Sequence, residues 1–251
     1  MVLAVAMALG ELRHQVTFVG GSAVGFLITN TAFLNVRPTD DVDVVVEVAS
    51  YGRYQDLLES LRKLGFVHDM EGPLCRLVIN GIKVDVMPTD ESILNFSNRW
   101  YPLAVCNATK LALSEDVSIN LVSAPMFVCT KFEAFFDRGK GDYLSSSDIE
   151  DIVAILNGRA EFVSECQAEE AEVVVYLRDC FGRLGSDGQF LNALPGILPF
   201  EARSVKPLFF QRLQNLAKCN RAKRGCNAFK VVVADASRQT RRWASCRILA
   251  P

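Results

Sequence analysis

The sequence predicts an α+β protein, in which a mixed β-sheet with flanking helices is followed by a helical C-terminal part. Two observations lead to this class. The first 123 residues carry short runs of β-branched and aromatic residues, bounded by glycine, proline and asparagine. From Pro125 onward, apolar residues recur at helical spacing instead.

Within the first 123 residues, apolar periodicity and turn residues predict each element. Tyr54, Leu57 and Leu61 recur at helical spacing, and Gly65 suits the end of that helix. The dipeptide Asn80-Gly81 between two alternating runs predicts a β-hairpin. The predicted helices cover residues 2–14, 22–29 and 51–66, and the predicted strands cover residues 16–20, 42–47, 75–79, 82–87, 102–106 and 119–123.

The remainder of the chain is predicted to be mainly helical. Pro125 suits a first helical turn, and the serine and acids near residue 147 are typical of a helix start. The predicted helices cover residues 125–138, 147–156, 160–184 and 209–224. We therefore divide the chain into a sheet domain (1–123), a helical domain (124–185) and a basic C-terminal extension (186–251).

Charge is distributed unevenly along the chain. Residues 1–200 carry 15 Lys and Arg against 27 Asp and Glu, whereas residues 201–251 carry 12 against 2. A basic end on an acidic body can dock on that body or bind a polyanion such as RNA, and composition leaves both alternatives open.

Several classes of protein are disfavoured by the sequence. The eight cysteines are scattered without the spacing of a zinc site, and reduced thiols suit a cytoplasmic protein. The apolar segment 1–9 is too short to span a membrane and lacks a basic start, so we expect a buried helix and no membrane partner. The chain contains no P-loop, dinucleotide-binding or nucleophile-elbow motif.

A glycine-rich turn follows the first predicted strand. Gly20, Gly21 and Ser22 lie where that strand gives way to a short helix. Free backbone N–H groups at a helix start favour an anion, and glycine lets a phosphate approach the backbone closely. Such turns are also common structural connections, so the turn alone does not define a site.

Three aspartates lie on two predicted strands. Asp41 and Asp43 are two residues apart, so their side chains share one face of a strand, whereas Asp40 points the other way. Asp85 lies in the second strand of the predicted hairpin and joins the pair if the two strands are neighbours. Clustered carboxylates suit Mg²⁺, which prefers oxygen ligands, and the alternative is a solvent-exposed strand edge.

These residues resemble the nucleotidyltransferase superfamily, whose members share a polymerase-β-like palm. The local sequence is similar to the AbiEii-type branch, the nucleotidyltransferase toxins of bacterial toxin–antitoxin and phage-defence systems. The first block of that branch reads Gly-Ser, then Arg-x-Thr-x-Asp-h-Asp, where h is apolar. The matching residues here are Gly21, Ser22, Arg37, Thr39, Asp41 and Asp43.

A second, helical block extends the resemblance over about residues 15–160. In that branch a lysine is followed by an alanine three residues on, an arginine four residues later, and then two acids at helical spacing. The matching residues here are Lys131, Ala134, Arg138, Asp148 and Asp151. The segment 139–147 is inserted before the acids, so either Asp148 or Asp151 can fill the final acidic role.

The resemblance implies Mg²⁺-dependent transfer of a nucleotide from an NTP to an acceptor hydroxyl. It implies that Asp41, Asp43 and Asp85 bind Mg²⁺ and act in catalysis together with Lys131 and Asp148. The implied nucleotide-binding residues are Gly21, Ser22, Arg37, Thr39 and Lys131.

The resemblance also implies partners. The acceptor expected for this branch is RNA, with tRNA first, and a cognate antitoxin protein is a second expected partner. Two alternatives stay open: transfer to a small hydroxyl compound, as in aminoglycoside-modifying relatives, and a catalytically silent module that binds a partner. The presence of all three strand aspartates argues against the silent module.

Overall fold

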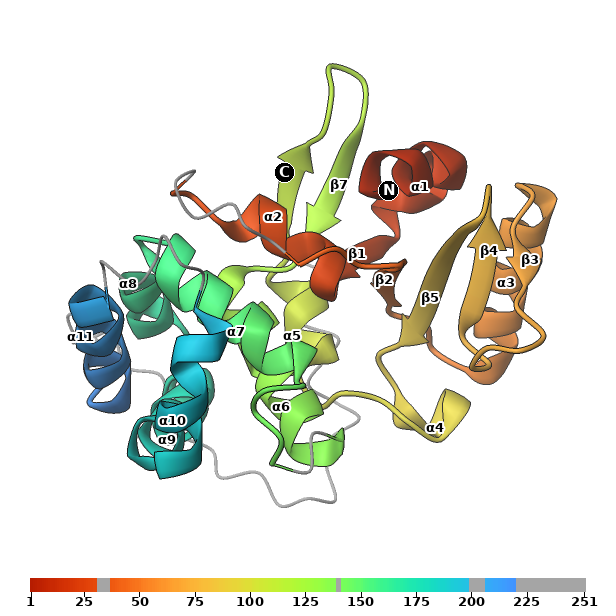
Figure 1. The fold of residues 1–251 in the computed structure, drawn as a ribbon. Coiled ribbons are helices and arrows are strands. Elements are labelled where there is room, and N and C mark those ends of the chain that lie inside the picture. The colour runs from red at the N-terminus through yellow and green to blue at the C-terminus, as the bar shows by residue number, and fades with distance from the viewer. Residues whose placement is uncertain (31–36, 139–140, 199–205, 220–251) are drawn as a thin grey trace, which may run out of the picture. The chain divides into compact units, whose positions relative to one another are not determined.

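The fold is built around one mixed sheet. The computed structural model describes residues 1–30, 37–138, 141–198 and 206–219. Within them, seven strands follow the spatial order β3-β4-β5-β2-β1-β7-β6 (Figure 1). The strands are β1 (Val16–Val19), β2 (Asp41–Val46), β3 (Val67–His68), β4 (Arg76–Ile79), β5 (Ile82–Pro88), β6 (Thr109–Ala112) and β7 (Ser118–Leu121).

The sheet mixes parallel and antiparallel pairs, which confirms the predicted α+β class. The pairs β2–β5 and β1–β7 are parallel, and the other four pairs are antiparallel. On β2, Val42 and Val44 are fully buried, while Asp41 and Asp43 are only partly buried. The strand therefore buries its valines on one face and presents its carboxylates on the other.

Two local sequence signals produce the predicted structure around the sheet. Asn80 and Gly81 both have positive φ angles, 51° and 78°, which suits the two-residue turn between β4 and β5. Helix α3 (Tyr51–Lys63) begins at Ser50, whose hydroxyl accepts a hydrogen bond from the Arg53 backbone N–H. Its buried residues are Tyr54, Leu57, Leu58 and Leu61, as the helical spacing predicts.

Helices make up most of the described residues beyond β7, as predicted. Helix α6 packs against α7 and α9, and α11 packs against α9 (Figure 1). The described residues all belong to one compact unit. The helices of this part are α6 (Ala124–Arg138), α7 (Ser147–Gly158), α8 (Phe162–Ala168), α9 (Ala171–Ser186), α10 (Gly188–Ile197) and α11 (Lys206–Ala217).

The helices nearer the N-terminus are shorter than predicted. The first prediction, residues 2–14, divides into α1 (Val2–Leu9) and a 3₁₀ turn (Gly10–His14). The second, residues 22–29, becomes a 3₁₀ turn (Gly21–Ala23) and α2 (Val24–Leu27). Val5, Ala6 and Leu9 are fully buried, so α1 contributes to the core as expected. Among the described residues, no helix combines the length and apolar character needed to cross a membrane.

Two secondary-structure predictions are wrong. Residues 102–106, predicted as a strand, lie in helix α5 (Tyr101–Cys106), where Pro102 occupies the first turn and Ala104 is buried. Proline removes a ladder hydrogen bond from a strand but fits a helix start. The predicted long helix 160–184 is broken between α8 and α9, where the backbone of Glu169 and Glu170 is extended. Acids are favoured at the start of a new helix, which stabilises that break.

Other elements escaped prediction. Strands β3 and β6 are short, and α4 (Glu91–Leu94) is a single turn capped by Asp90. Helix α10 begins at Asp187, whose carboxylate accepts hydrogen bonds from two backbone N–H groups. The predicted helix 209–224 corresponds to α11, and the end of that prediction lies outside the described residues, as does most of the basic segment 201–251.

Candidate active site

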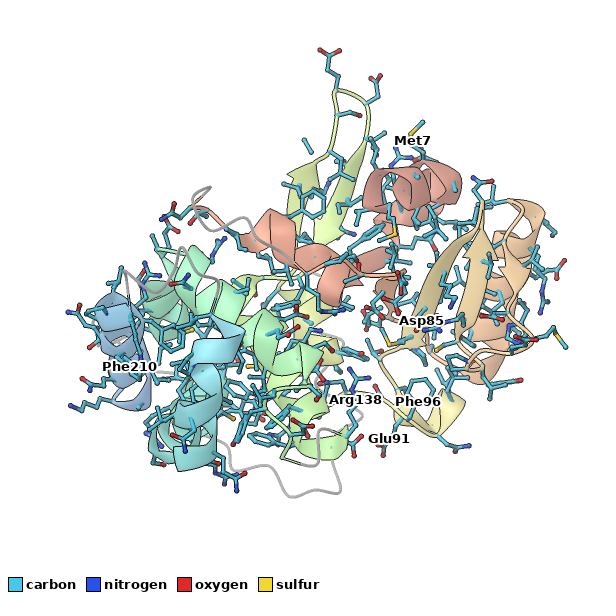
Figure 2. The ribbon with its side chains drawn as sticks, in the orientation of Figure 1. Met7, Asp85, Glu91, Phe96, Arg138 and Phe210 are labelled. Atoms are coloured by element: carbon cyan, nitrogen blue, oxygen red, sulfur yellow. The ribbon has the colours of Figure 1, made fainter. Side chains whose placement is uncertain are left out.

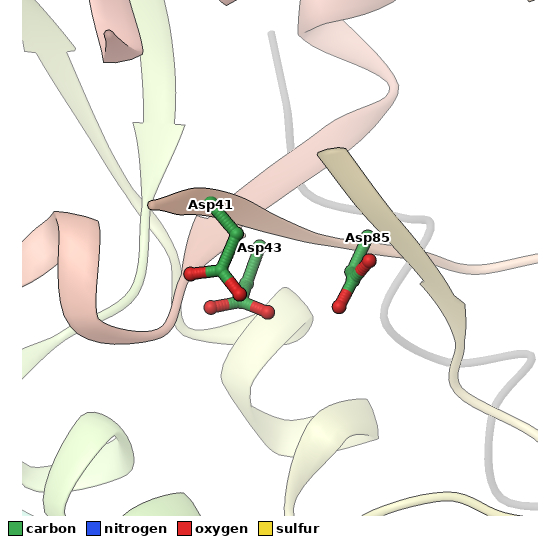
Figure 3. A group of neighbouring side chains, drawn as sticks. All are labelled: Asp41, Asp43 and Asp85. Atoms are coloured by element: carbon green, nitrogen blue, oxygen red, sulfur yellow. The ribbon is translucent and has the colours of Figure 1, made fainter. Parts of the chain in front are cut away.

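The three predicted aspartates converge on one face of the sheet. Strands β2 and β5 are parallel neighbours, and their register places Asp43 directly opposite Asp85. Asp41 lies two residues before Asp43 on the same face of β2. Each residue offers a carboxylate oxygen, and these oxygens lie within 4.8 Å of one another (Figure 3). The cluster could hold a metal ion.

The cluster is electrostatically strained when its carboxylates are ionised. Burial, followed by repulsion from Asp41, raises the pKa of Asp43 to about 7, although the charge of Lys131 opposes this rise. A proton or a cation relieves such crowding. Since a divalent cation supplies two positive charges at the point where three carboxylates meet, metal binding would restore Asp43 to its ionised form.

The glycine turn lies directly against Asp43. Strand β1 pairs Val19 with Asp43, so the next residue, Gly20, follows beside the carboxylate. Gly20 has φ 66° and ψ −172°, a conformation that L-residues with a side chain avoid. A Cβ added to Gly20 would overlap the Asp43 carboxylate. Glycine is therefore required here for both backbone conformation and close approach.

The next two residues of the turn, Gly21 and Ser22, are also closely packed. A Cβ on Gly21 would lie 2.7 Å from Thr39 Cγ2 and 3.6 Å from Asp151 Oδ2. Ser22 Oγ is buried, and no hydrogen-bond partner for it occurs in the described part of the chain. A buried hydroxyl without a partner is costly, and an incoming polar group at this turn would satisfy it.

Lys131 connects the helical part to the site. Its Nζ lies 2.7 Å from Asp151 Oδ2 and 3.2 Å from Asp148 Oδ1, and its side chain is only 10% exposed. Burial alone would lower the pKa of Lys131, but the charges of Asp151, Asp148 and Asp43 together raise it. Lys131 is therefore charged. Both Asp148 and Asp151, between which the sequence left the choice open, contact it.

Arg138 adds a second cation at the end of α6. Its Nη2 lies 3.2 Å from Asp148 Oδ2, while most of its side chain is exposed. Figure 2 shows Arg138 on α6 and Asp85 on β5. The charges of Arg138 and Lys131 both oppose the rise in the pKa of Asp43, which places α6 within electrostatic reach of the cluster.

The two remaining predicted residues lie on the segment that leads into β2. Arg37 Nε is 3.6 Å from Glu150 Oε2 on α7, and both side chains are partly exposed. Thr39 donates a long hydrogen bond, 3.4 Å, to the Asp41 carbonyl and lies against Gly21. Both residues thus connect the turn, β2 and α7 around the same site.

Sequence reasoning missed Arg76, which contacts the cluster directly. Its Nε and Nη2 donate hydrogen bonds of 2.7 Å to the two carboxylate oxygens of Asp85. Counting outward from the Asn80-Gly81 turn pairs residue 79 with 82 and therefore 76 with 85, as the structure shows. The hairpin signal in the sequence was sufficient to place Arg76 opposite Asp85.

Comparison with known protein families gives no match for this chain, and comparison with curated proteins gives none either.

Proposed function

We propose that this protein is a nucleotidyltransferase that uses Mg²⁺ to move an NMP from an NTP to an acceptor hydroxyl. One observation carries the proposal. Three carboxylates meet within 4.8 Å beside a glycine turn that carries a buried, unsatisfied hydroxyl at Ser22. A cation site adjoining an anion site is the arrangement that a metal–triphosphate requires.

The donor set fits Mg²⁺. All three ligands are carboxylates, which suit a hard cation, and they come from two rigid neighbouring strands. Asp41 and Asp43, with Asp85 beside them, would hold the ion. When bound, Mg²⁺ neutralises charge on the reacting phosphoryl group and on the leaving pyrophosphate.

The chain's own groups bind and orient the reactants. Backbone N–H groups of Gly21 and Ser22 and the Ser22 hydroxyl bind the triphosphate, and Lys131 contributes positive potential from α6. The acceptor oxygen forms a bond to the α-phosphorus while the bond to the bridging oxygen breaks, so pyrophosphate leaves. The hydroxyl proton passes to a carboxylate of the cluster.

The proposed acceptor is RNA, with tRNA ends as the first candidates. Support comes from the excess of basic residues in 201–251, which suits phosphate contacts, and from the resemblance to the AbiEii-type toxins. The same resemblance supports a cytoplasmic toxin that is controlled by an antitoxin protein.

The position of the radiolabel tests the reaction. The full chain is incubated with Mg²⁺, total RNA and each NTP labelled at either the α- or the γ-phosphate. We expect RNA to gain the α-label and never the γ-label, and we expect Asp41→Asn to abolish that gain. Asp40→Asn makes the same chemical change at an exposed neighbouring residue and serves as the matched control.

Each other outcome has a defined meaning. Transfer of the α-label to small molecules but not to RNA would replace the proposed acceptor and keep the reaction. Transfer of the γ-label would indicate a kinase. If none of the labelled NTPs reacts or binds in the presence of Mg²⁺, the proposal is contradicted and a silent binding module is favoured.

A further inference from the structure

Arg76 bridges two of the three carboxylates. Besides its paired hydrogen bonds to Asp85, its Nη2 lies 3.4 Å from Asp41 Oδ2. Asp41 is on β2 and Asp85 on β5, so one guanidinium spans both strands at the cluster. Its nitrogens therefore occupy positions from which a cation would contact these two carboxylates.

Both the backbone and the side-chain stem of Arg76 are held in place by their neighbours. Arg76 is paired with Asp85 in the β4–β5 ladder, and its backbone N–H donates to the Pro73 carbonyl at 2.9 Å. A Cβ on Gly72 would lie 2.8 Å from Arg76 Cδ, so the loop before β4 packs closely on the side-chain stem. The Arg76 side chain is 20% exposed and that of Asp85 is 12% exposed.

The contact between Arg76 and Asp85 is a bidentate, charge-assisted pair of hydrogen bonds. A planar guanidinium that donates two parallel hydrogen bonds to one carboxylate gains both charge and directional specificity. Arginine is always protonated in proteins, so Arg76 carries its positive charge whether or not the carboxylates are ionised. Arg76 is thus a permanent cation at the cluster.

Building on the proposed function, we propose that the Arg76 guanidinium takes the place of a second metal ion at this site. It neutralises Asp85 and one side of Asp41, so the site takes one divalent ion, held by Asp41 and Asp43, instead of two. Charge balance supports this count, because one divalent ion and one guanidinium together offset three carboxylates. A second ion between Asp41 and Asp85 would have to displace Arg76 from both.

The test is to count bound Mn²⁺ by electron paramagnetic resonance, using the full chain with and without NTP. We expect one ion per wild-type chain and a second ion in Arg76→Met, which keeps an unbranched stem but removes the charge. Arg53→Ala, a change at an exposed arginine on α3, should leave the count at one. Arg76→Lys should also bind one ion because it retains a cation.

The outcomes separate this inference from the proposed function. Two ions in the wild-type chain would overturn the inference while leaving nucleotidyl transfer intact. A count that stays at one in folded Arg76→Met would overturn it as well. If Arg76→Met does not fold, the number of ions bound by the wild-type chain tests the inference: one ion supports it, and two ions overturn it. Absence of Mn²⁺ from all variants, even with NTP, would instead contradict the proposed function.

Discussion

Replacing Asp43 with asparagine should stabilise the metal-free protein while removing its metal binding. Asp43 has an ordinary pKa of 3.8 when unfolded and about 7 when folded, because burial and Asp41 disfavour its charge. Each pKa unit corresponds to about 1.4 kcal/mol, so the ionised carboxylate costs at most about 4 kcal/mol of folding free energy. Because Asp43 is partly exposed, solvent screening reduces this to about 2 kcal/mol.

The sign of the pH dependence follows from the raised pKa. Below about pH 4 the carboxyl group is protonated in both states and costs nothing. Between about pH 4 and pH 7 the unfolded chain ionises first, so the cost grows, and it reaches its full size above pH 7. Asparagine has no such cost. The advantage of Asp43→Asn should therefore be small at pH 4.5 and largest at pH 8.

Thermal unfolding followed by circular dichroism in EDTA measures the effect. A difference of about 2 kcal/mol in a unit of this size corresponds to a rise in Tm of about 4–8 °C at pH 8. Added Mg²⁺ should raise the Tm of the wild-type chain but not that of Asp43→Asn. Asp40→Asn should behave as wild type. A lower Tm for Asp43→Asn at pH 8 without metal would refute this account of the cluster.

Three further predictions test the surroundings of the cluster. Gly20→Ala should destabilise the protein by about 2 kcal/mol or more in urea unfolding, since the new Cβ meets a carboxylate and the backbone is restricted to glycine. A loss below about 0.5 kcal/mol would contradict this. Ser22→Ala removes an unsatisfied buried hydroxyl, so Tm should stay the same or rise while the Kd for Mg²⁺–NTP rises about tenfold in calorimetry. Unchanged affinity would exclude Ser22 from the nucleotide site. Lys131→Met removes the ion pair of buried Asp151, whereas Asp148 keeps its contact with Arg138. The substitution should cost about 3–5 kcal/mol in the same urea assay, more than an exposed lysine could.

The aspartate cluster was partly predictable from the sequence because strand alternation fixes which side chains share a face. Asp41 and Asp43 are two residues apart, and Asp85 lies in the second strand of a hairpin whose turn is specified by Asn80-Gly81. What alternation could not supply is the order of strands in the sheet. The parallel pairing of β2 with β5, on which the whole cluster depends, is a tertiary contact.

The surroundings of the cluster were less predictable. The contact of Lys131 with both acids of α7 depends on how two helices pack, and sequence spacing alone left the choice between Asp148 and Asp151 open. Helix α5 was mistaken for a strand because its short apolar run fits either structure. Arg76 was overlooked although the hairpin register specifies its partner.

The most direct test of the central claim is calorimetric titration of the full chain with each Mg²⁺–NTP. The account predicts that at least one nucleotide binds with a Kd in the micromolar to submillimolar range. It also predicts that EDTA or Asp41→Asn weakens this binding at least tenfold, whereas Asp40→Asn does not. Binding that is equally strong without Mg²⁺, or equally strong in Asp41→Asn, would contradict the claim that these carboxylates hold a metal–triphosphate.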